Sequence, residues 1–310
     1  MKLAVIGSGI SGMTAAWLLS SAHDVDVLEA EDRLGGHTHT IDVRLDGRTL
    51  AADTGFMVFN HRTYPNLVQL FEHLGIDEQD ADMSFSVQHL ADGIEWRGDL
   101  AGLFAQPSNA FRPAFWEMLA HVLRLSHSAE RLLADPDIDS LTLGGLLQRE
   151  GYGRSFVDWY LVPMGAAIWS MPADRMLAFP AGSFLRFCDN HGLLHVTGKP
   201  PWKSIPGGAR RYTLALADRV SGRVRTGAKV ACVQRFDDRV DVRLATGEAL
   251  TYEGVVLACH TDDALGMLAD PSDAETDVLS AIAYQANDVV LHTDESTLPR
   301  RHGAWAAWNH

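Results

Sequence analysis

The chain has 310 residues, 46% of them hydrophobic and 21% charged, a composition typical of a globular protein with one large domain or two interleaved ones. Its formal net charge of −14 argues against nucleic acid as a partner and disfavours broad electrostatic adhesion to anionic membranes, while local hydrophobic docking stays open. No apolar run approaches the ~20 residues that span a bilayer. Three widely spaced cysteines indicate reduced thiols in a cytoplasmic setting.

The N-terminal residues carry the pattern of a dinucleotide-binding unit. An apolar, β-rich run precedes three glycines, a helix expected over residues 13–22 and a second strand that ends at Glu29. Gly7 permits a tight turn, Gly9 lets the backbone approach a pyrophosphate, and Gly12 lets the helix lie close to the strand. The phosphates would then meet the N–H groups at the start of the helix, where the helix dipole favours negative charge.

The acidic residue after the second strand refines this prediction. Glu29 stands about 20 residues after the glycines, where it would accept hydrogen bonds from a ribose diol. Ala30 and Glu31 follow where a 2′-phosphate binder would have arginine, so NADP is a poor fit. Three glycines alone are a weak signal, but their flanks favour dinucleotide binding over an ordinary turn in an unrelated α/β protein. The glycines also interrupt the apolar core of any signal peptide.

Beyond residue 36 the pattern first predicts a hairpin and then a helix. Two alternating runs within residues 37–50 turn at Asp46 and Gly47, which is a strong hairpin signal. Residues 53–59 are expected to form an apolar strand that contains a glycine, where backbone or ligand approaches closely. Helical periodicity then runs from Tyr64 to Gly75.

Residues from about 100 to 195 indicate mainly helices. One apolar stripe is expected at Trp116, Leu119, Ala120 and Leu123, and another begins at Phe156, Trp159 and Tyr160. The segment is rich in large apolar side chains, most of which should be helical core. Trp169 and Phe187 are candidate walls of an apolar substrate pocket, although core packing is the usual role of any one such ring.

The pattern becomes β-like again after the turn at 206–208. A helix over 212–220 is expected to lead to a strand over 224–230, a meander over 231–252 and a fully buried strand over 255–259. The nucleotide-binding domain is therefore interrupted, because the chain leaves it near residue 60 and returns near residue 206.

Other kinds of active site find little support in the sequence. His191 and His195 stand at helical spacing, but no third ligand accompanies them and no zinc motif is present, so no metal site is expected. No G-x-S-x-G motif points to a hydrolase. Lys199 and Lys203 are interpreted as ordinary surface lysines.

The N-terminal motif resembles the FAD fingerprint of the flavin amine oxidase superfamily, which includes monoamine oxidases, protoporphyrinogen oxidase and phytoene desaturases. The continuation from Arg33 to Gly36 (Arg-x-Gly-Gly) separates that group from NAD enzymes. The resemblance implies an α/β fold, with a glutathione-reductase-type Rossmann FAD domain that holds an inserted β-meander, plus a largely helical substrate domain. It implies the FAD domain at 1–60 and 206–265, and the substrate domain at 61–205 and 266–310.

The resemblance also implies FAD as the cofactor and places its contacts on matching positions. Thr54 and Gly55 would pass near the flavin, and the backbone of Val230 would meet the adenine. His37 stands where many relatives have a second arginine, so the pyrophosphate contacts are expected to differ. No catalytic residue is identified. The positions expected to bind FAD are Gly7, Gly9, Ile10, Ser11, Gly12, Glu29, Ala30, Arg33, Gly35, Gly36, His37, Thr38, Thr54, Gly55 and Val230.

Residues 36–40, 167–170 and 183–194 resemble more closely a bacterial subgroup of flavin amine oxidase-like proteins associated with cyclopropane or other modified fatty acid synthesis. This resemblance implies hydride transfer to flavin from a modified fatty acyl chain or another lipid. It also implies association with a fatty-acid-modifying methyltransferase and a cytoplasmic location, with transient contact at the inner membrane. The family's closing Gly-Asp segment does not appear before residue 310, so a C-terminal truncation is expected.

Three alternatives remain open. The runner-up substrate is a small amine. An NAD-dependent dehydrogenase is a different class of enzyme, against which the Arg-x-Gly-Gly continuation and the meander argue. The third alternative is a non-catalytic flavin-binding partner of a lipid-modifying enzyme, whose flavin no candidate substrate would reduce.

Overall fold

The computed structural model describes residues 1–169, 171–195, 198 and 200–310, and Ser170 and Lys199 of the sequence motifs lie outside that set. The chain divides into two compact units. Unit 1 comprises Met1–Phe59, Tyr64–Gln79 and Lys203–Asp288, and unit 2 comprises Asn60–Thr63, Asp80–Trp202 and Val289–His310. These bounds differ from the expected domains, because residues 64–79, 203–205 and 266–288 also belong to unit 1 and Asn60 belongs to unit 2.

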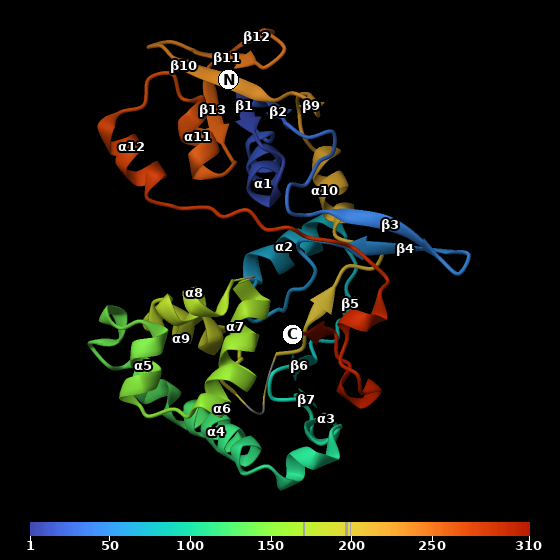
Figure 1. Cartoon of the computed structure of the whole chain (residues 1–310). Coiled ribbons are helices and arrows are strands. Elements are labelled where there is room, and N and C mark those ends of the chain that lie inside the picture. The colour runs from blue at the N-terminus through green and yellow to red at the C-terminus, as the bar shows by residue number, and fades with distance from the viewer. Residues whose placement is uncertain (170, 196–197, 199) are drawn as a thin grey trace. The chain divides into compact units, whose positions relative to one another are not determined.

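A four-stranded parallel sheet forms the centre of unit 1 (Figure 1). Its order is β13-β1-β2-β9, with the bounds β1 Lys2–Ile6, β2 Asp24–Leu28, β9 Val224–Arg225 and β13 Gly254–Leu257. Helix α1 (Ile10–Leu19) connects β1 to β2. Four of the five residues in β1 and in β2 are buried, and in β2 the buried set includes Asp26.

Each face of this sheet packs against its own cluster. Leu3 and Val5 contribute to the cluster that also holds apolar residues of α1, α2 (Pro65–Leu74) and α10 (Arg210–Ala217). Ala4 and Ile6, which alternate with them, join the other cluster, with residues of the antiparallel meander. The meander has the order β10-β11-β12, with the bounds β10 Val230–Arg235, β11 Val240–Leu244 and β12 Ala249–Tyr252.

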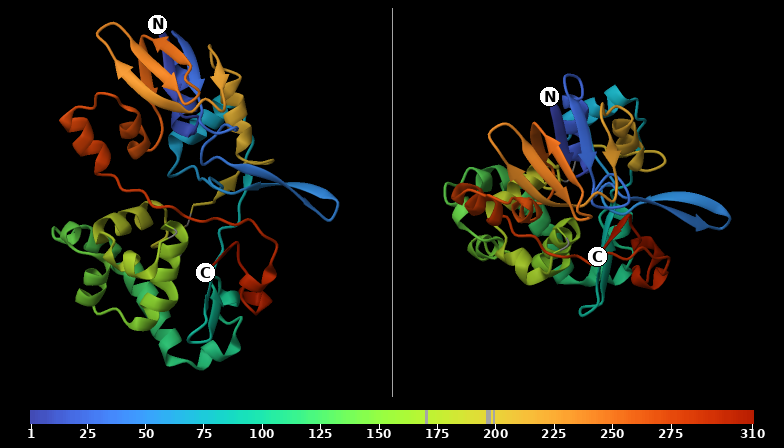
Figure 2. Two further views of the ribbon diagram at one scale, coloured as in Figure 1. Left: turned by 45° about the horizontal axis from the view of Figure 1, so that its top comes forward. Right: turned by 90° about the horizontal axis from the view of Figure 1, so that it is seen from above.

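The expected hairpin is confirmed as β3 (Thr40–Leu45) paired with β4 (Arg48–Asp53), and it extends away from the parallel sheet of its unit (Figure 2). Asp46 and Gly47 both have positive φ, at 50° and 74°, as a two-residue hairpin turn requires. Unit 1 also contains α11 (Thr261–Met267) and α12 (Asp273–Ser280). The expected helix over 64–75 is confirmed and ends at Gly75 with φ 68°.

Three strand predictions in unit 1 are wrong. The strand expected over 255–259 as fully buried is β13, which ends at Leu257, lies at the edge of the sheet and has only partly buried residues. The strand expected over 224–230 ends at Arg225, because Gly227 takes a left-handed conformation and its N–H donates to Glu31 O. The strand expected over 53–59 does not form, because β4 ends at Asp53 and the chain then bends at Thr54. Helix positions are also shifted, since α1 begins three residues before the expected range.

Unit 2 is largely helical, as expected for residues 100–195. A three-stranded sheet that the sequence did not indicate accompanies the helices, in the order β14-β6-β7, with bounds β6 Phe85–His89, β7 Ile94–Arg97 and β14 Trp308–Asn309. Strand β8 (Lys203–Ser204), which belongs to unit 1, pairs with β5 (Gln79–Asp80) in a separate two-stranded sheet. The helices are α3 Leu100–Leu103, η1 Pro107–Phe111, α4 Pro113–Leu133, η2 Ile138–Ser140, α5 Leu143–Arg149, α6 Arg154–Phe156, η3 Val157–Leu161, α7 Val162–Trp169, α8 Ala173–Ala178, α9 Ala181–Asn190, η4 Glu295–Thr297 and η5 His302–Ala304.

The stripe expected on α4 is also wrong. Trp116 and Leu123 are 51% and 48% exposed, whereas the neighbouring positions Phe115 and Met118 are fully buried. The buried face is thus rotated by about one residue from the expected one. Phe156 and Trp159 of the second stripe are buried as expected. None of the helices among the described residues is long and apolar enough to cross a membrane.

Candidate functional site

The three glycines of the turn between β1 and α1 have two different roles. Gly7 has φ 100°, and a Cβ there would lie 2.5 Å from Ala258 O. A Cβ at Gly12 would collide with Gly7 O, so this glycine lets α1 approach the turn. Gly9, in contrast, has an ordinary φ of −61° and no atom within 4 Å of a Cβ built on it. Gly7 and Gly12 therefore serve the fold, whereas Gly9 borders open space.

Helix α1 begins at this open position. Gly9 is its N-cap residue and makes no side-chain cap, and the first turn carries no acidic side chain. The first N–H groups of a helix have no intrahelical acceptor, and the helix dipole makes this end attractive to anions. The backbone from Ile10 to Gly12 thus offers donors for a phosphate group, and Ile10 is 39% exposed.

Glu29 directly follows β2, and its neighbours hold its carboxylate in place. Its Oε2 accepts from Ser8 N at 2.8 Å and from Ser8 Oγ at 2.5 Å, and its Oε1 accepts from Glu31 N at 2.9 Å. Ser8 Oγ in turn accepts from Gly35 N at 3.0 Å. Ser8 therefore joins the glycine turn, the acidic residue and the second glycine pair. Ser8 lies inside the glycine motif, but no local pattern marks it as a site residue.

The second glycine pair folds back onto the first turn. Gly35 and Gly36 have φ values of 113° and 55°, and a Cβ at Gly36 would lie 3.2 Å from Gly9 Cα. Arg33 Nη1 donates to Gly36 O at 2.8 Å, and Thr38 N donates to Gly35 O at 2.9 Å. The Arg-x-Gly-Gly motif thus forms a closed loop packed against the open position at Gly9.

Thr54 and Gly55 pack against residues 37–39, which directly follow this loop. Thr54 Oγ1 contacts His39 Nδ1 at 3.0 Å, and Phe56 N donates to His37 O at 2.9 Å. A Cβ at Gly55 would collide with His37 O, so a glycine is needed for this close approach. The expectation of a close backbone approach within residues 53–59 is confirmed, and the neighbour is the protein's own backbone.

Two further segments meet the same region of unit 1. In the turn at 206–208, Gly208 has φ 89°, and Ala209 N donates to both Asp53 carboxylate oxygens, at 3.0 and 3.1 Å. Val230 begins β10, two residues after Ala228, whose N–H donates to Glu29 O at 2.7 Å. Val230 thus lies next to the end of β2, and Ala30 follows Glu29 there.

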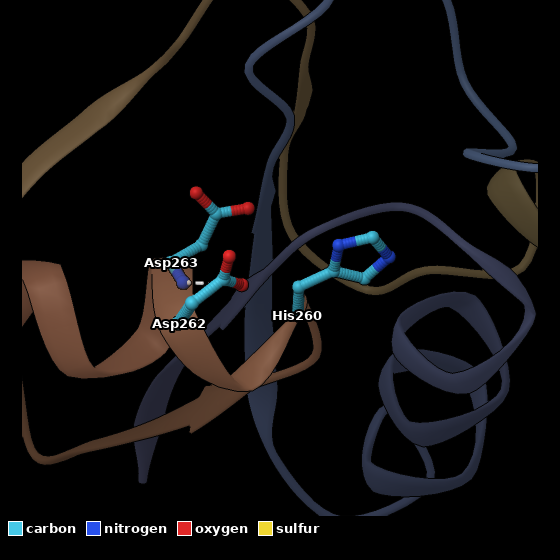
Figure 3. A group of neighbouring side chains, drawn as sticks. All are labelled: His260, Asp262 and Asp263. Carbon is cyan, nitrogen blue, oxygen red and sulfur yellow. Dashed lines mark hydrogen bonds between the residues drawn. The ribbon is translucent and has the colours of Figure 1, made fainter. Parts of the chain in front are cut away.

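One group of side chains among the described residues has the proximity of metal ligands. His260, Asp262 and Asp263 gather at the beginning of α11, with ligand atoms within 4.8 Å of one another (Figure 3). All three are exposed, and exposed acidic groups are common without a metal ion. His191 and His195 do not share a helix, because α9 ends at Asn190.

The candidate substrate residues lie in an aromatic cluster of unit 2. Trp169 packs against Phe187, Phe179 and Phe184, with ring centroids 4.7, 5.2 and 5.6 Å apart. Phe187 stacks on His191 at 4.0 Å, and the Nδ1 of His191 donates to Phe187 O at 2.9 Å. Phe184 is fully buried, whereas Trp169 and Phe187 are partly exposed. The structure brings the two predicted rings together.

Comparison with known proteins matches residues 10–304 to the model of the family described as flavin-containing amine oxidoreductases. The flavin-dependent L-tryptophan oxidase RebO of Lentzea aerocolonigenes is 25% identical over 80% of this chain and 55% of its own length. A redesigned putrescine oxidase has a TM-score of 0.67 at 20% identity, covering 90% of this chain and 62% of that one. A fatty acid isomerase from P. acnes has a TM-score of 0.63 at 17% identity, covering 90% and 63%.

These structural likenesses lie below 25% identity and show the fold alone. They agree with the mixed α/β architecture expected from the sequence. The chain spans about half the length of the curated relatives it matches.

Proposed function

Because the chain belongs to the flavin-containing amine oxidoreductase family, we propose that it binds FAD and acts as an FAD-dependent oxidoreductase. Unit 1 is then a glutathione-reductase-type Rossmann domain with the β-meander inserted before its last parallel strand. The observation that carries the proposal is the open position at Gly9, which a Cβ would fill and which faces no protein atom within 4 Å.

The residues around Gly9 fit the successive parts of the cofactor. The N–H groups from Ile10 to Gly12 would receive the diphosphate at the start of α1. The Glu29 carboxylate, already oriented by Ser8, would accept from the ribose hydroxyls of the adenosine half. Gly35, Gly36, Thr38, Thr54 and Gly55 would enclose the cofactor along the second loop, and Val230 would contribute its backbone to the adenine.

FAD, when bound, supplies the acceptor for a hydride from a substrate carbon. The task left to this chain is to hold the substrate against the reactive ring and to exclude water. Apolar aromatic side chains do both, because they bury the substrate's hydrocarbon part and leave few sites for ordered water.

The aromatic cluster of unit 2 favours a substrate with an apolar body, such as a modified fatty acyl chain or another lipid. Trp169 and Phe187 expose part of their rings while their neighbour Phe184 is fully buried. On this proposal the protein works in the cytoplasm, peripheral to the inner membrane, beside a fatty-acid-modifying methyltransferase.

A small amine is the second candidate substrate. The family is described as amine oxidoreductases, and one similar structure is a putrescine oxidase. An amine with an apolar body would fit the same aromatic cluster, since cations also bind favourably over aromatic faces.

Both candidates are tested by the visible spectrum of the purified protein during anaerobic titration. We expect flavin absorption that bleaches when the correct substrate is added, and a fatty acyl chain, a monoamine and a diamine should be compared side by side. Glu29→Ala is the matched variant, because it removes the ribose acceptors and should bind less flavin.

A colourless protein that takes up no added FAD would refute the cofactor assignment. Bound flavin that none of these substrates reduces would refute the enzymatic proposal and favour a non-catalytic flavin-binding partner. Bleaching by the amines alone would replace the lipid with the second candidate.

A further inference from the structure

Three aromatic rings of unit 1 form one continuous stack. The ring centroids of His37 and His260 lie 5.8 Å apart with an interplanar angle of 23°, and those of His260 and Tyr284 lie 4.1 Å apart at 11°. The hydroxyl oxygen of Tyr284 accepts from Thr261 N at 3.1 Å, which ties the end of the stack to the beginning of α11. Segments more than 200 residues apart in the sequence thus bring two imidazoles together.

Both histidines are attached to backbone that contacts the glycine turn. His37 follows Gly36, which packs against Gly9, and its carbonyl oxygen is held by Phe56 N. His260 follows the segment of Ala258, whose carbonyl oxygen packs against Gly7. The two rings are therefore carried by two different loops whose backbones lie beside the glycine turn that precedes α1. Both side chains are exposed, so a ligand can reach them.

The start of α1 lacks a cationic side chain of its own. Residues 10–13 are Ile, Ser, Gly and Met, which offer only backbone N–H groups to a diphosphate, apart from the serine hydroxyl. The nearby Arg33 directs one guanidinium nitrogen to Gly36 O at 2.8 Å. Imidazole N–H groups are good donors to phosphate oxygens, and a protonated imidazole adds an attractive charge.

We propose that His37 and His260 act together as a two-imidazole clamp on the diphosphate of FAD, with Tyr284 holding His260 from behind. This inference rests on the proposed binding of FAD and names a contact, His260, that the N-terminal motif does not contain. Asp262 and Asp263 lie in the first turn of α11, and a carboxylate oxygen of each lies within 4.8 Å of one ring nitrogen of His260. The clamp therefore requires the other ring nitrogen of His260 to face the diphosphate.

The clamp is tested with variants that keep the stack but remove the hydrogen-bond donors. His37→Phe, His260→Phe and the double variant should each be titrated with FAD. Loss of a charge-assisted hydrogen bond should weaken FAD binding about tenfold in each single variant. If the two rings hold one diphosphate jointly, the double variant should fall well short of the roughly hundredfold product of independent effects.

His73→Phe is the matched control. His73 is an exposed histidine of the same unit that also contacts an aromatic ring, that of Trp17, and we expect it to leave FAD affinity unchanged. ADP and adenosine should be used as competitors. The clamp predicts that the two histidine variants weaken ADP and leave adenosine unchanged, because adenosine has no diphosphate.

Wild-type FAD affinity in the single phenylalanine variants, multiplicative losses in the double variant, or an equal loss for adenosine would each overturn the clamp. None of these results would affect the proposed cofactor. Failure of the wild-type protein to bind FAD at all would instead refute the proposed function on which the clamp rests.

Discussion

Asp26 is a buried carboxylate that joins three segments of unit 1. It is 3% exposed and accepts from Arg223 N at 2.7 Å and from the Tyr252 hydroxyl at 3.0 Å. Burial alone would raise the pKa of this carboxyl. The hydrogen bonds from Arg223 N, the Tyr252 hydroxyl and the Arg223 guanidinium outweigh burial and hold the pKa below its ordinary value of 3.8.

The lowered pKa of Asp26 predicts how stability depends on pH. A carboxyl whose pKa is lower in the folded state adds stability above its unfolded pKa and loses it as the pH falls through the folded one. Asp26→Asn should therefore lower the free energy of unfolding by about 1–3 kcal/mol at pH 7. The difference from wild type should shrink below about pH 4, as measured by urea unfolding.

Asp24→Asn, at an exposed position of the same strand, provides the comparison and should change stability little. A destabilisation by Asp26→Asn that is equally large at pH 7 and pH 3 would mean that the charge of Asp26 contributes nothing and that only its shape matters.

At the scale of elements, the sequence predicted correctly the turns and strands that are determined by residues close together in the chain. The glycine turn, the hairpin at Asp46 and Gly47 and the meander all follow from short-range signals. The strand expected over 224–230 is too long, because the β-like residue pattern continues through Gly227, whereas the left-handed backbone of Gly227 does not fit a strand. The pairing of β14 with β6 joins residues more than 200 positions apart, so no local pattern could reveal it.

The residues of the candidate site fall into the same two groups, those marked by a local sequence pattern and those brought together by tertiary structure. The N-terminal residues were identified because one continuous motif contains them. The sequence does not reveal Ser8, because its hydrogen bonds to Glu29 depend on tertiary structure. It does not reveal the proposed role of His260 either, because the neighbouring ring of His37 lies far away in the sequence.

Helix α9 offers a matched pair that separates core from substrate wall. Phe184 is fully buried, whereas Phe187, less than one turn later, is partly exposed and stacks on His191. Phe184→Ala should lower the free energy of unfolding by ~3–5 kcal/mol. Phe187→Ala should lower it less and should instead weaken flavin reduction by the apolar substrate.

Melting temperature, flavin content and substrate-driven reduction should be measured on both variants. If Phe187→Ala loses as much stability as Phe184→Ala and the surviving folded protein responds normally to substrate, Phe187 is simply core and the pocket assignment fails.

At the scale of the whole molecule, the two units carry different parts of the proposal. Every expected FAD contact lies in unit 1, and both candidate substrate residues lie in unit 2. A ligand that binds only the folded state raises its stability by RT ln(1 + [L]/Kd), so the shift in melting temperature caused by FAD should grow with the logarithm of its affinity. The shift therefore reports binding directly, before any substrate is known.

The most direct measurement is the FAD-induced shift in melting temperature of wild type, Gly9→Ala and Gly12→Ala. Gly9 has an ordinary φ and open space, so Gly9→Ala should melt like wild type without FAD and lose most of the shift. Gly12→Ala should melt lower even without FAD, because its Cβ collides with Gly7 O. A full FAD shift in Gly9→Ala, or no shift in wild type, would contradict FAD binding at the glycine turn.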